Sequence, residues 1–135
     1  MIRKIPRETA TFHFHNENPT GRRTGDCVIR AIARASGDSW DDTLTGLFKV
    51  ALKMKSELAY KDCYDRYLQE QGWTKGKQPR KADGTKYTVA EWYKKNPHAT
   101  QVISVANHLT CMIDGKCNDI WNCTSLTVLN YWTKA

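Results

Sequence analysis

The last third of the chain has a different residue pattern from the part before it. Before residue 97, the longer patterned segments place apolar residues at helical spacing. From Gln101 onward, short runs rich in β-branched and aromatic residues alternate with turn signals, which predicts strands at 101–106, 108–113, 117–121 and 127–132. Helices followed by strands, without βαβ alternation, indicate an α+β fold. We therefore predict N-terminal helices packed on a C-terminal antiparallel sheet built from hairpins.

The segments before this sheet have recognisable start and stop signals. Apolar periodicity predicts a helix over 26–36, a second helix capped by Ser39 or Asp38, and a third around 60–68 that stops at Gly72. Thr88 and Glu91 have the spacing of a capping box, which predicts a short helix to Lys95. The alternation in 11–15 indicates a short strand at a sheet edge.

Length and composition favour a single domain. A chain of 135 residues is long enough to bury about two-thirds of its unfolded surface without a metal or disulfide framework. We see neither the apolar run of a signal peptide nor a stretch that could span a bilayer. The five cysteines are an odd count and are expected to remain thiols. We therefore expect one cytoplasmic domain over 1–135, with no cofactor and no membrane partner.

Cys27 lies in the first turn of the first predicted helix, where either Thr24 or Asp26 is the cap. A helix N-terminus lowers the pKa of a thiol and leaves backbone amides unpaired, and such amides can stabilise an oxyanion. Asp26 opposes thiolate formation unless its carboxylate turns toward Arg30, one helical turn on. Most free cysteines are small buried hydrophobic residues. Its position nevertheless favours Cys27 as a nucleophile.

His108 and Asp119 flank a predicted hairpin turn at Asp114-Gly115. With a two-residue loop, residue 113 pairs with 116, and the imidazole and the carboxylate lie on the same face of the sheet. With a three-residue loop the faces exchange, and Asn118 or Asn122 becomes the partner of the imidazole. A thiol, an imidazole and a carboxylate or amide in this order suggest a nucleophile, its base and the group that orients the base.

These residues resemble the papain-like cysteine peptidase superfamily, in which a helix-opening Cys is followed by a His and an Asn or Asp on neighbouring strands. Residues 119–121, Asp-Ile-Trp, are similar to the family's Asn-Ser-Trp signature, and residues 25–27, Gly-Asp-Cys, resemble the nucleophile helix of its bacteriocin-processing branch. The resemblance covers 24–36 and 101–122. It implies a papain-like thiol hydrolase acting on a peptide or protein, with Cys27, His108 and Asp119 as its triad. The chain also resembles small proteins carried by bacteria and their phages.

Two further residues are candidates for supporting this triad. The family usually places a Gln before the nucleophile to complete the oxyanion hole, and residues 15–26 contain none. Asn18 is the best substitute, with Asn16 next. Trp121 follows the carboxylate closely, and we expect it either to shield the contact between His108 and Asp119 from water or to be a core aromatic residue.

Zinc binding is one alternative to a thiol hydrolase. The residues that offer zinc-ligand atoms are His108, Cys111, Cys117 and Cys123. Their spacing lacks the Cys-x-x-Cys knuckle of structural zinc sites, and the domain is large enough to fold without a metal. We therefore expect no metal.

A non-enzymatic binding module is the second alternative. Residues 75–86 hold five Lys or Arg against one Asp, in a chain of net charge +7. Such a basic loop can attract an acidic protein or a nucleic acid while the papain-like scaffold is catalytically inactive. No aromatic residues alternate with these charges as a base-stacking surface requires, so we do not expect a nucleic-acid partner.

Overall fold

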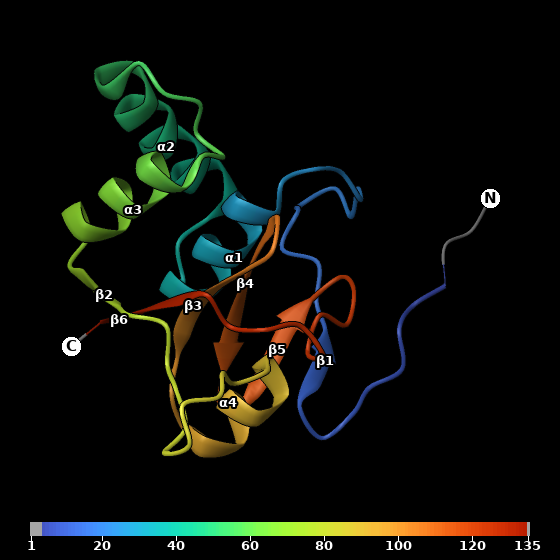
Figure 1. Cartoon of the computed structure of the whole chain (residues 1–135). Helices are drawn as coiled ribbons and strands as arrows, with labels where there is room; N and C mark the ends of the chain where they lie inside the picture. Colours follow the sequence, from blue (N-terminus) through green and yellow to red (C-terminus); the bar gives the residue numbers. More distant parts are fainter. Residues whose placement is uncertain (1–3, 135) are drawn as a thin grey trace.

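A six-stranded mixed sheet with helices on both faces makes up the computed structural model, which describes residues 4–134 (Figure 1). In chain order the elements are β1 (Phe12–Phe14), α1 (Cys27–Ser36), α2 (Trp40–Met54), α3 (Lys61–Glu70), β2 (Trp73–Gly76), α4 (Val89–Lys95), β3 (Gln101–Val105), β4 (His108–Ile113), β5 (Lys116–Asp119) and β6 (Asn130–Lys134). The predicted α+β class is confirmed. The two ends of the predicted domain, 1–3 and 135, lie outside the described residues.

The sheet has the strand order β1-β5-β4-β3-β6-β2 and differs from the prediction in three ways. β1 lies at an edge, as expected, but runs parallel to β5, so the expectation of a purely antiparallel sheet is wrong there. β2 was not predicted, because its four residues show no alternation of apolar and polar side chains. Trp73 is its only buried residue. The last strand begins at Asn130, later than predicted, where it can pair with both β3 and β2.

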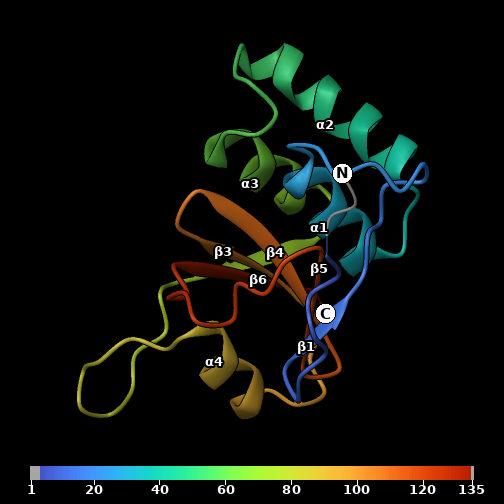
Figure 2. The ribbon, with the colours of Figure 1, turned by 90° about the vertical axis from the view of Figure 1, so that its right-hand side faces the viewer.

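Two apolar cores lie on opposite faces of the sheet. Figure 2 shows α1, α2 and α3 on one side of the sheet and α4 on the other. Helices α1, α2 and α3 cover one face, where Ile32 and Trp132 are fully buried, and α4 covers the other face with Tyr93. Successive side chains of a strand point to opposite faces, so the neighbours Val102 and Ile103 of β3 belong to different cores. The strands that hold the candidate site residues are therefore packed from both sides.

The helix starts largely follow the predicted signals. Ser39 caps α2 through its side chain, and Thr88 and Glu91 form the predicted capping box of α4. Asp26, rather than Thr24, directly precedes α1, but its carboxylate makes no capping hydrogen bond because it is bound elsewhere. Within residues 4–134, none of the helices has the length and apolar character that crossing a bilayer requires.

The β4–β5 hairpin has the two-residue loop that places His108 and Asp119 on one face. Ile113 pairs with Lys116, and both loop residues have positive φ, 48° at Asp114 and 75° at Gly115. Positive φ at both positions is the type I′ geometry that suits tight hairpins. This confirms the first of the two predicted registers.

We expect Gly115→Ala to destabilise this hairpin more than an alanine at another left-handed glycine. A Cβ at residue 115 would lie 2.8 Å from the carbonyl oxygen of Pro97, whereas at Gly84, with a φ of 87°, it would meet nothing within 4 Å. The expected loss in free energy of unfolding is about 1–2 kcal/mol for Gly84→Ala, from backbone strain. It is about 2–4 kcal/mol for Gly115→Ala, from strain and overpacking together. Urea unfolding measures both, and equal losses would contradict the clash.

Candidate active site

His108 and Asp119 form a buried pair at the end of the β4–β5 hairpin. The His108 Nε2 atom lies 2.7 Å from Asp119 Oδ2, and the two side chains are 8% and 2% exposed. Neither alternative partner takes this place: Asn118 Oδ1 accepts from Arg34, and Asn122 Oδ1 accepts from Thr124. Because Nε2 faces the carboxylate, Nδ1 is the ring nitrogen that can exchange a proton with another group.

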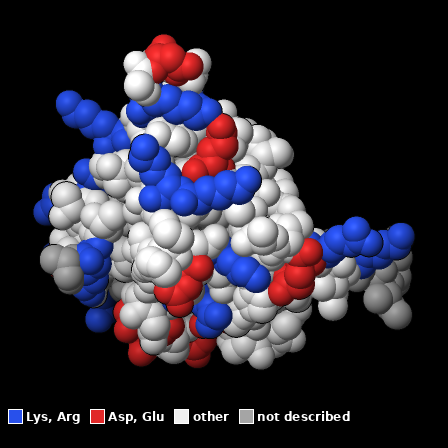
Figure 3. Space-filling view, turned by 90° about the horizontal axis from the view of Figure 1, so that it is seen from below, with Lys and Arg blue, Asp and Glu red and all other residues white. Residues whose placement is uncertain are grey.

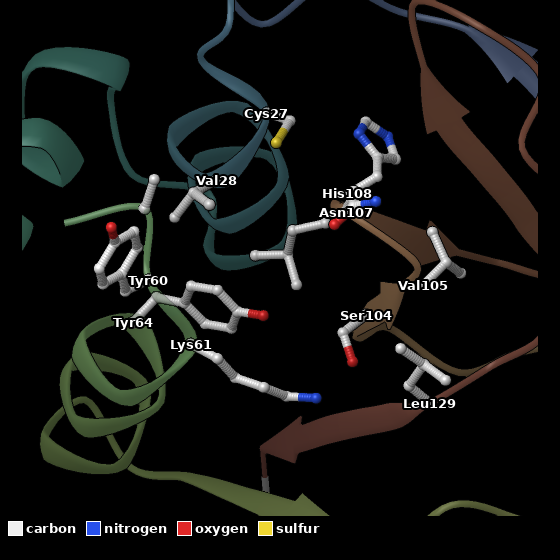
Figure 4. Close-up of a pocket in the computed structure, with 12 residues that line it drawn as sticks. Cys27, Val28, Tyr60, Lys61, Tyr64, Ser104, Val105, Asn107, His108 and Leu129 are labelled. Atoms are coloured by element: carbon white, nitrogen blue, oxygen red, sulfur yellow. The ribbon is translucent and has the colours of Figure 1, made fainter. Parts of the chain in front are cut away.

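Cys27 lies beside His108 at the N-terminus of α1. Both residues line one pocket of about 440 Å³, and Figure 4 shows the sulfur and the imidazole ring on the same side of it. Burial raises the pKa of the Cys27 thiol, but hydrogen bonding to His108 and to the Leu109 amide outweighs it, and the pKa lies below its ordinary value. Both interactions favour the thiolate form of Cys27 over the thiol.

The imidazole is correspondingly easy to protonate. Burial alone would lower the pKa of His108, but the hydrogen bonds to Asp119 and Cys27 raise it to about 9. Contact with His108 also holds the pKa of Asp119 below its ordinary value despite burial. At neutral pH these directions favour an imidazolium held between a thiolate and a carboxylate.

Arg30 ties the N-terminal turn of α1 to Asp119. Its Nε donates to Asp26 Oδ1 at 2.7 Å, and its Nη1 donates to Asp119 Oδ1 at 2.9 Å. The condition under which Asp26 does not oppose thiolate formation is thus met, because its carboxylate is turned toward Arg30. Trp40 Nε1 also donates to Asp26 at 3.0 Å, so this carboxylate is fully engaged away from the thiol. The buried guanidinium in turn contributes to the lowered pKa of Cys27.

Asn18 belongs to this carboxylate cluster rather than to the pocket. Its Nδ2 donates to Asp26 Oδ2 at 3.0 Å, while its Oδ1 accepts from the backbone and side chain of Thr20. Asn16 instead supports the loop, accepting from the Asn18 amide. We therefore correct the assignment of Asn18 from an oxyanion donor to a supporting residue. The backbone amide of Cys27, at the open end of α1, is then the remaining predicted donor.

Trp121 covers one side of the imidazole. Its ring centroid lies 4.8 Å from that of His108, with the two planes at 53°. The indole is 40% exposed, whereas the His108 side chain is only 8% exposed. Trp121 is thus not a core residue, and its contact fits the predicted shielding of the His108 ring from water.

Pocket residues from α3 and from the segment before β6 were not predicted. Lys61, Tyr64 and Leu129 line the same pocket as Cys27. Burial and the nearby Cys27 charge raise the pKa of Tyr64 to about 12, so its hydroxyl stays protonated. No sequence spacing relates α3 to the triad, because only the packing of α3 beside α1 and the sheet brings these side chains together.

Metal binding is the other chemistry that these side chains allow. One ligand atom each from His108, Asp119 and Cys123 lie within 4.8 Å of one another. Compared with the zinc alternative considered from the sequence, this group gains Asp119 and lacks Cys111 and Cys117. The Cys117 sulfur lies 3.8 Å from that of Cys123. A cation here would meet the charge of Arg30, whose guanidinium already holds Asp119. The donor set therefore fits a metal poorly.

The basic segment 75–86 is partly neutralised within the fold. Lys81 pairs with Glu91 and lies 5.6 Å from the ring centroid of Tyr87, and Arg80 donates to the Gly84 carbonyl at 2.9 Å. Figure 3 shows acidic side chains between the basic ones on the face seen from below. Binding of an acidic partner at this segment stays a prediction.

Comparisons with known proteins do not indicate a function for this chain, so a function has to be inferred from the geometry of the site. No protein-family model, curated protein or solved structure matches this chain. The features that bear on function are therefore the thiol at the start of α1, the imidazole beside it and the carboxylate behind the imidazole. All three lie at the edge of one pocket or directly beneath it.

Proposed function

We propose that the protein is a cysteine-dependent hydrolase of papain-like fold, with Cys27, His108 and Asp119 as its triad. The observation that supports this most is the position of His108. Its Nε2 lies 2.7 Å from Asp119 Oδ2, and it lines the same pocket as Cys27, whose thiol pKa is lowered by its interaction with His108. This is the arrangement of an activated nucleophile, its base and an orienting group.

The reaction proceeds through an acyl-enzyme. The Cys27 thiolate attacks the carbonyl carbon of an amide, and the oxyanion that forms is stabilised by the Cys27 backbone amide. As the C–N bond breaks, His108 donates its Nδ1 proton to the leaving amine. Water then attacks the thioester, His108 accepts a proton from it, and the carboxylic acid leaves as the thiolate is restored. Asp119 keeps the Nε2 side of the ring in place throughout.

A peptide or protein is the substrate class that follows from this proposal. Peptide hydrolysis, side-chain deamidation and acyl transfer share the first half of the reaction, and they differ in the leaving amine and in the acceptor that reaches the thioester. The first test therefore addresses formation and breakdown of the acyl-enzyme, which all three reactions have in common.

The test uses a panel of N-acetyl amino-acid p-nitrophenyl esters and intact-protein mass spectrometry. We expect a burst of nitrophenol and an acyl adduct on Cys27, followed by turnover. Cys27→Ala should abolish the adduct, and His108→Ala should slow acylation by about 10²–10⁴-fold, because the imidazole that lowers the pKa of the Cys27 thiol is lost. Cys63→Ala is the matched control, since Cys63 is buried and its thiol pKa is raised. Equal acylation of the wild type and His108→Ala would contradict the proposal.

A further inference from the structure

The pocket beside Cys27 has a marked charge asymmetry. Among the described residues that line it, Lys61 supplies the only Lys or Arg side chain, and none is an Asp or Glu. Cys27 and Val28 bring the N-terminus of α1 to the pocket, and Tyr60 and Lys61 bring the N-terminus of α3. Helix N-termini carry partial positive charge. The pocket therefore favours a negatively charged group.

Lys61 is positioned by Asn130 at the start of β6. Its Nζ donates to Asn130 Oδ1, and Asn130 is fixed by its own hydrogen bonds to Gly76 and Ser104. Figure 4 shows Lys61 and Tyr64 extending from α3 into the pocket, opposite Cys27 and His108. An ammonium has three donors, and the amide oxygen uses one of them. The others remain available to an anionic ligand.

Lys61 makes no direct ion pair with a carboxylate of the described residues, although the charge of Asp65 acts on it from a distance. Asp65, one turn further along α3, instead accepts from Trp132 Nε1 at 2.8 Å and from Gln69 Nε2 at 3.0 Å. Ion pairs within residues 4–134 involve other lysines and arginines, such as the pair of Lys81 with Glu91. A partly buried ammonium that makes no ion pair with the described residues can bind a negatively charged group of a ligand.

We infer that the substrate carries a carboxylate, which Lys61 binds while the scissile carbonyl lies at Cys27. The inference rests on the proposed function and specifies its substrate class. Val105, Leu129 and the ring of Tyr64 supply apolar walls for the hydrocarbon that joins the two groups. Two sources share this chemistry: an acidic side chain, and the free C-terminus of a peptide. In either case Lys61 is a specificity-determining residue, because it touches a part of the substrate that does not react.

Matched electrophiles test this without a known substrate. Iodoacetyl-glycine and iodoacetyl-glycinamide compare a terminal carboxylate with a neutral amide. The α-amides of iodoacetyl-glutamate and iodoacetyl-glutamine make the same comparison for a side chain. The quantity measured is the ratio of Cys27 alkylation rates, acid over amide, followed by peptide mass spectrometry. We expect the ratio to fall about tenfold in Lys61→Met for the pair that matches the substrate.

Controls separate local recognition from general attraction of anions. Lys61→Arg should keep most of the preference, and Lys75→Met, which removes an exposed charge near Lys61, should keep it almost entirely. Lys61→Gln repeats the test with a polar side chain if the methionine variant melts at a lower temperature. The neutral probes report the reactivity of Cys27 itself, so taking the acid-to-amide ratio within each variant removes any effect of the Lys61 substitutions on the thiolate. Lys75→Met should leave the rate with the neutral probes unchanged.

The outcomes distinguish the two proposals. If the neutral probes label Cys27 selectively but the acid-to-amide ratio is the same in the wild type, Lys61→Met and Lys61→Gln, the substrate inference is wrong and the hydrolase proposal stands. If the neutral probes show no selectivity for Cys27 over the other thiols, the hydrolase proposal fails, and the substrate inference fails with it.

Discussion

Replacing Arg30 with methionine is expected to destabilise the protein by about 3–5 kcal/mol at neutral pH, because it leaves buried carboxylates without their cation. Arg30 is 6% exposed and bonds both Asp26 and Asp119, which are 7% and 2% exposed. Methionine fills a similar volume but removes both ion pairs. Urea unfolding of the two proteins at pH 7 measures the difference.

The effect of Arg30→Met should depend on pH in a defined direction. Contacts that include Arg30 hold the pKa values of Asp26 and Asp119 below their ordinary value of 3.8. A carboxyl group whose pKa is lowered in the fold stabilises the protein above its unfolded-state pKa, and this stabilisation is lost as pH falls through the folded-state pKa. The difference in free energy of unfolding between the wild type and Arg30→Met should therefore be largest above pH 3.8 and should become smaller in more acidic solution.

Arg34→Met is the matched control for this prediction. Arg34 lies one turn further along α1 and donates to a neutral acceptor, Asn118 Oδ1, at 3.2 and 3.3 Å. Its loss should cost about 0.5–1.5 kcal/mol, the usual range for one hydrogen bond. Because no carboxylate is involved, the loss in free energy of unfolding should be the same in acidic and in neutral solution. Equal losses for the two variants, or a loss in Arg30→Met that does not vary with pH, would contradict the role of the buried ion pairs.

Iodoacetamide at pH 6 is expected to label Cys27 selectively, and His108→Ala should reduce the rate of labelling about 100-fold. A free thiol is only about 0.3% ionised at that pH. Hydrogen bonding to His108 lowers the pKa of Cys27, so removing the imidazole returns the thiol toward its ordinary ionisation. Residue-resolved mass spectrometry measures the rate at each of the five cysteines.

The controls for this labelling use other residues of the same types. His98→Ala removes an exposed histidine in the segment between α4 and β3 and should leave the rate at Cys27 unchanged. Cys63 and Cys111 are buried with raised thiol pKa values and should react slowly in every variant. Faster labelling of either thiol than of Cys27, or an unchanged rate in His108→Ala, would remove the basis for a thiolate–imidazolium pair.

The rates of Cys27 alkylation and of amide hydrolysis should depend differently on pH above about pH 9. The His108 pKa is raised to about 9, so the imidazolium is present below that pH and is lost above it. Alkylation needs only the thiolate and should continue on a plateau. Amide hydrolysis also needs the His108 proton for the leaving amine and should decline above about pH 9. A parallel rise of both rates past this point would contradict the role of His108 as the acid.

Features that depend on residues close together in the chain could be predicted from the sequence. Thr88 and Glu91 predicted the start of α4, and Asp114-Gly115 predicted the hairpin register that puts His108 and Asp119 on the same face. Each of these signals acts over a few residues through backbone geometry and local hydrogen bonds. The α+β class also followed from local periodicity, summed over longer segments.

The contacts between side chains far apart in the chain could not be predicted and became visible only in the folded structure. Arg30 reaches Asp119 over a separation of 89 residues, Asn18 bonds Asp26 in place of pointing at the pocket, and Lys61 enters the pocket from α3. These contacts follow from the packing of whole elements, and no residue spacing encodes them. The candidate triad combines both levels, since the turn aligns His108 with Asp119 while the packing of α1 against β4 brings Cys27 to them.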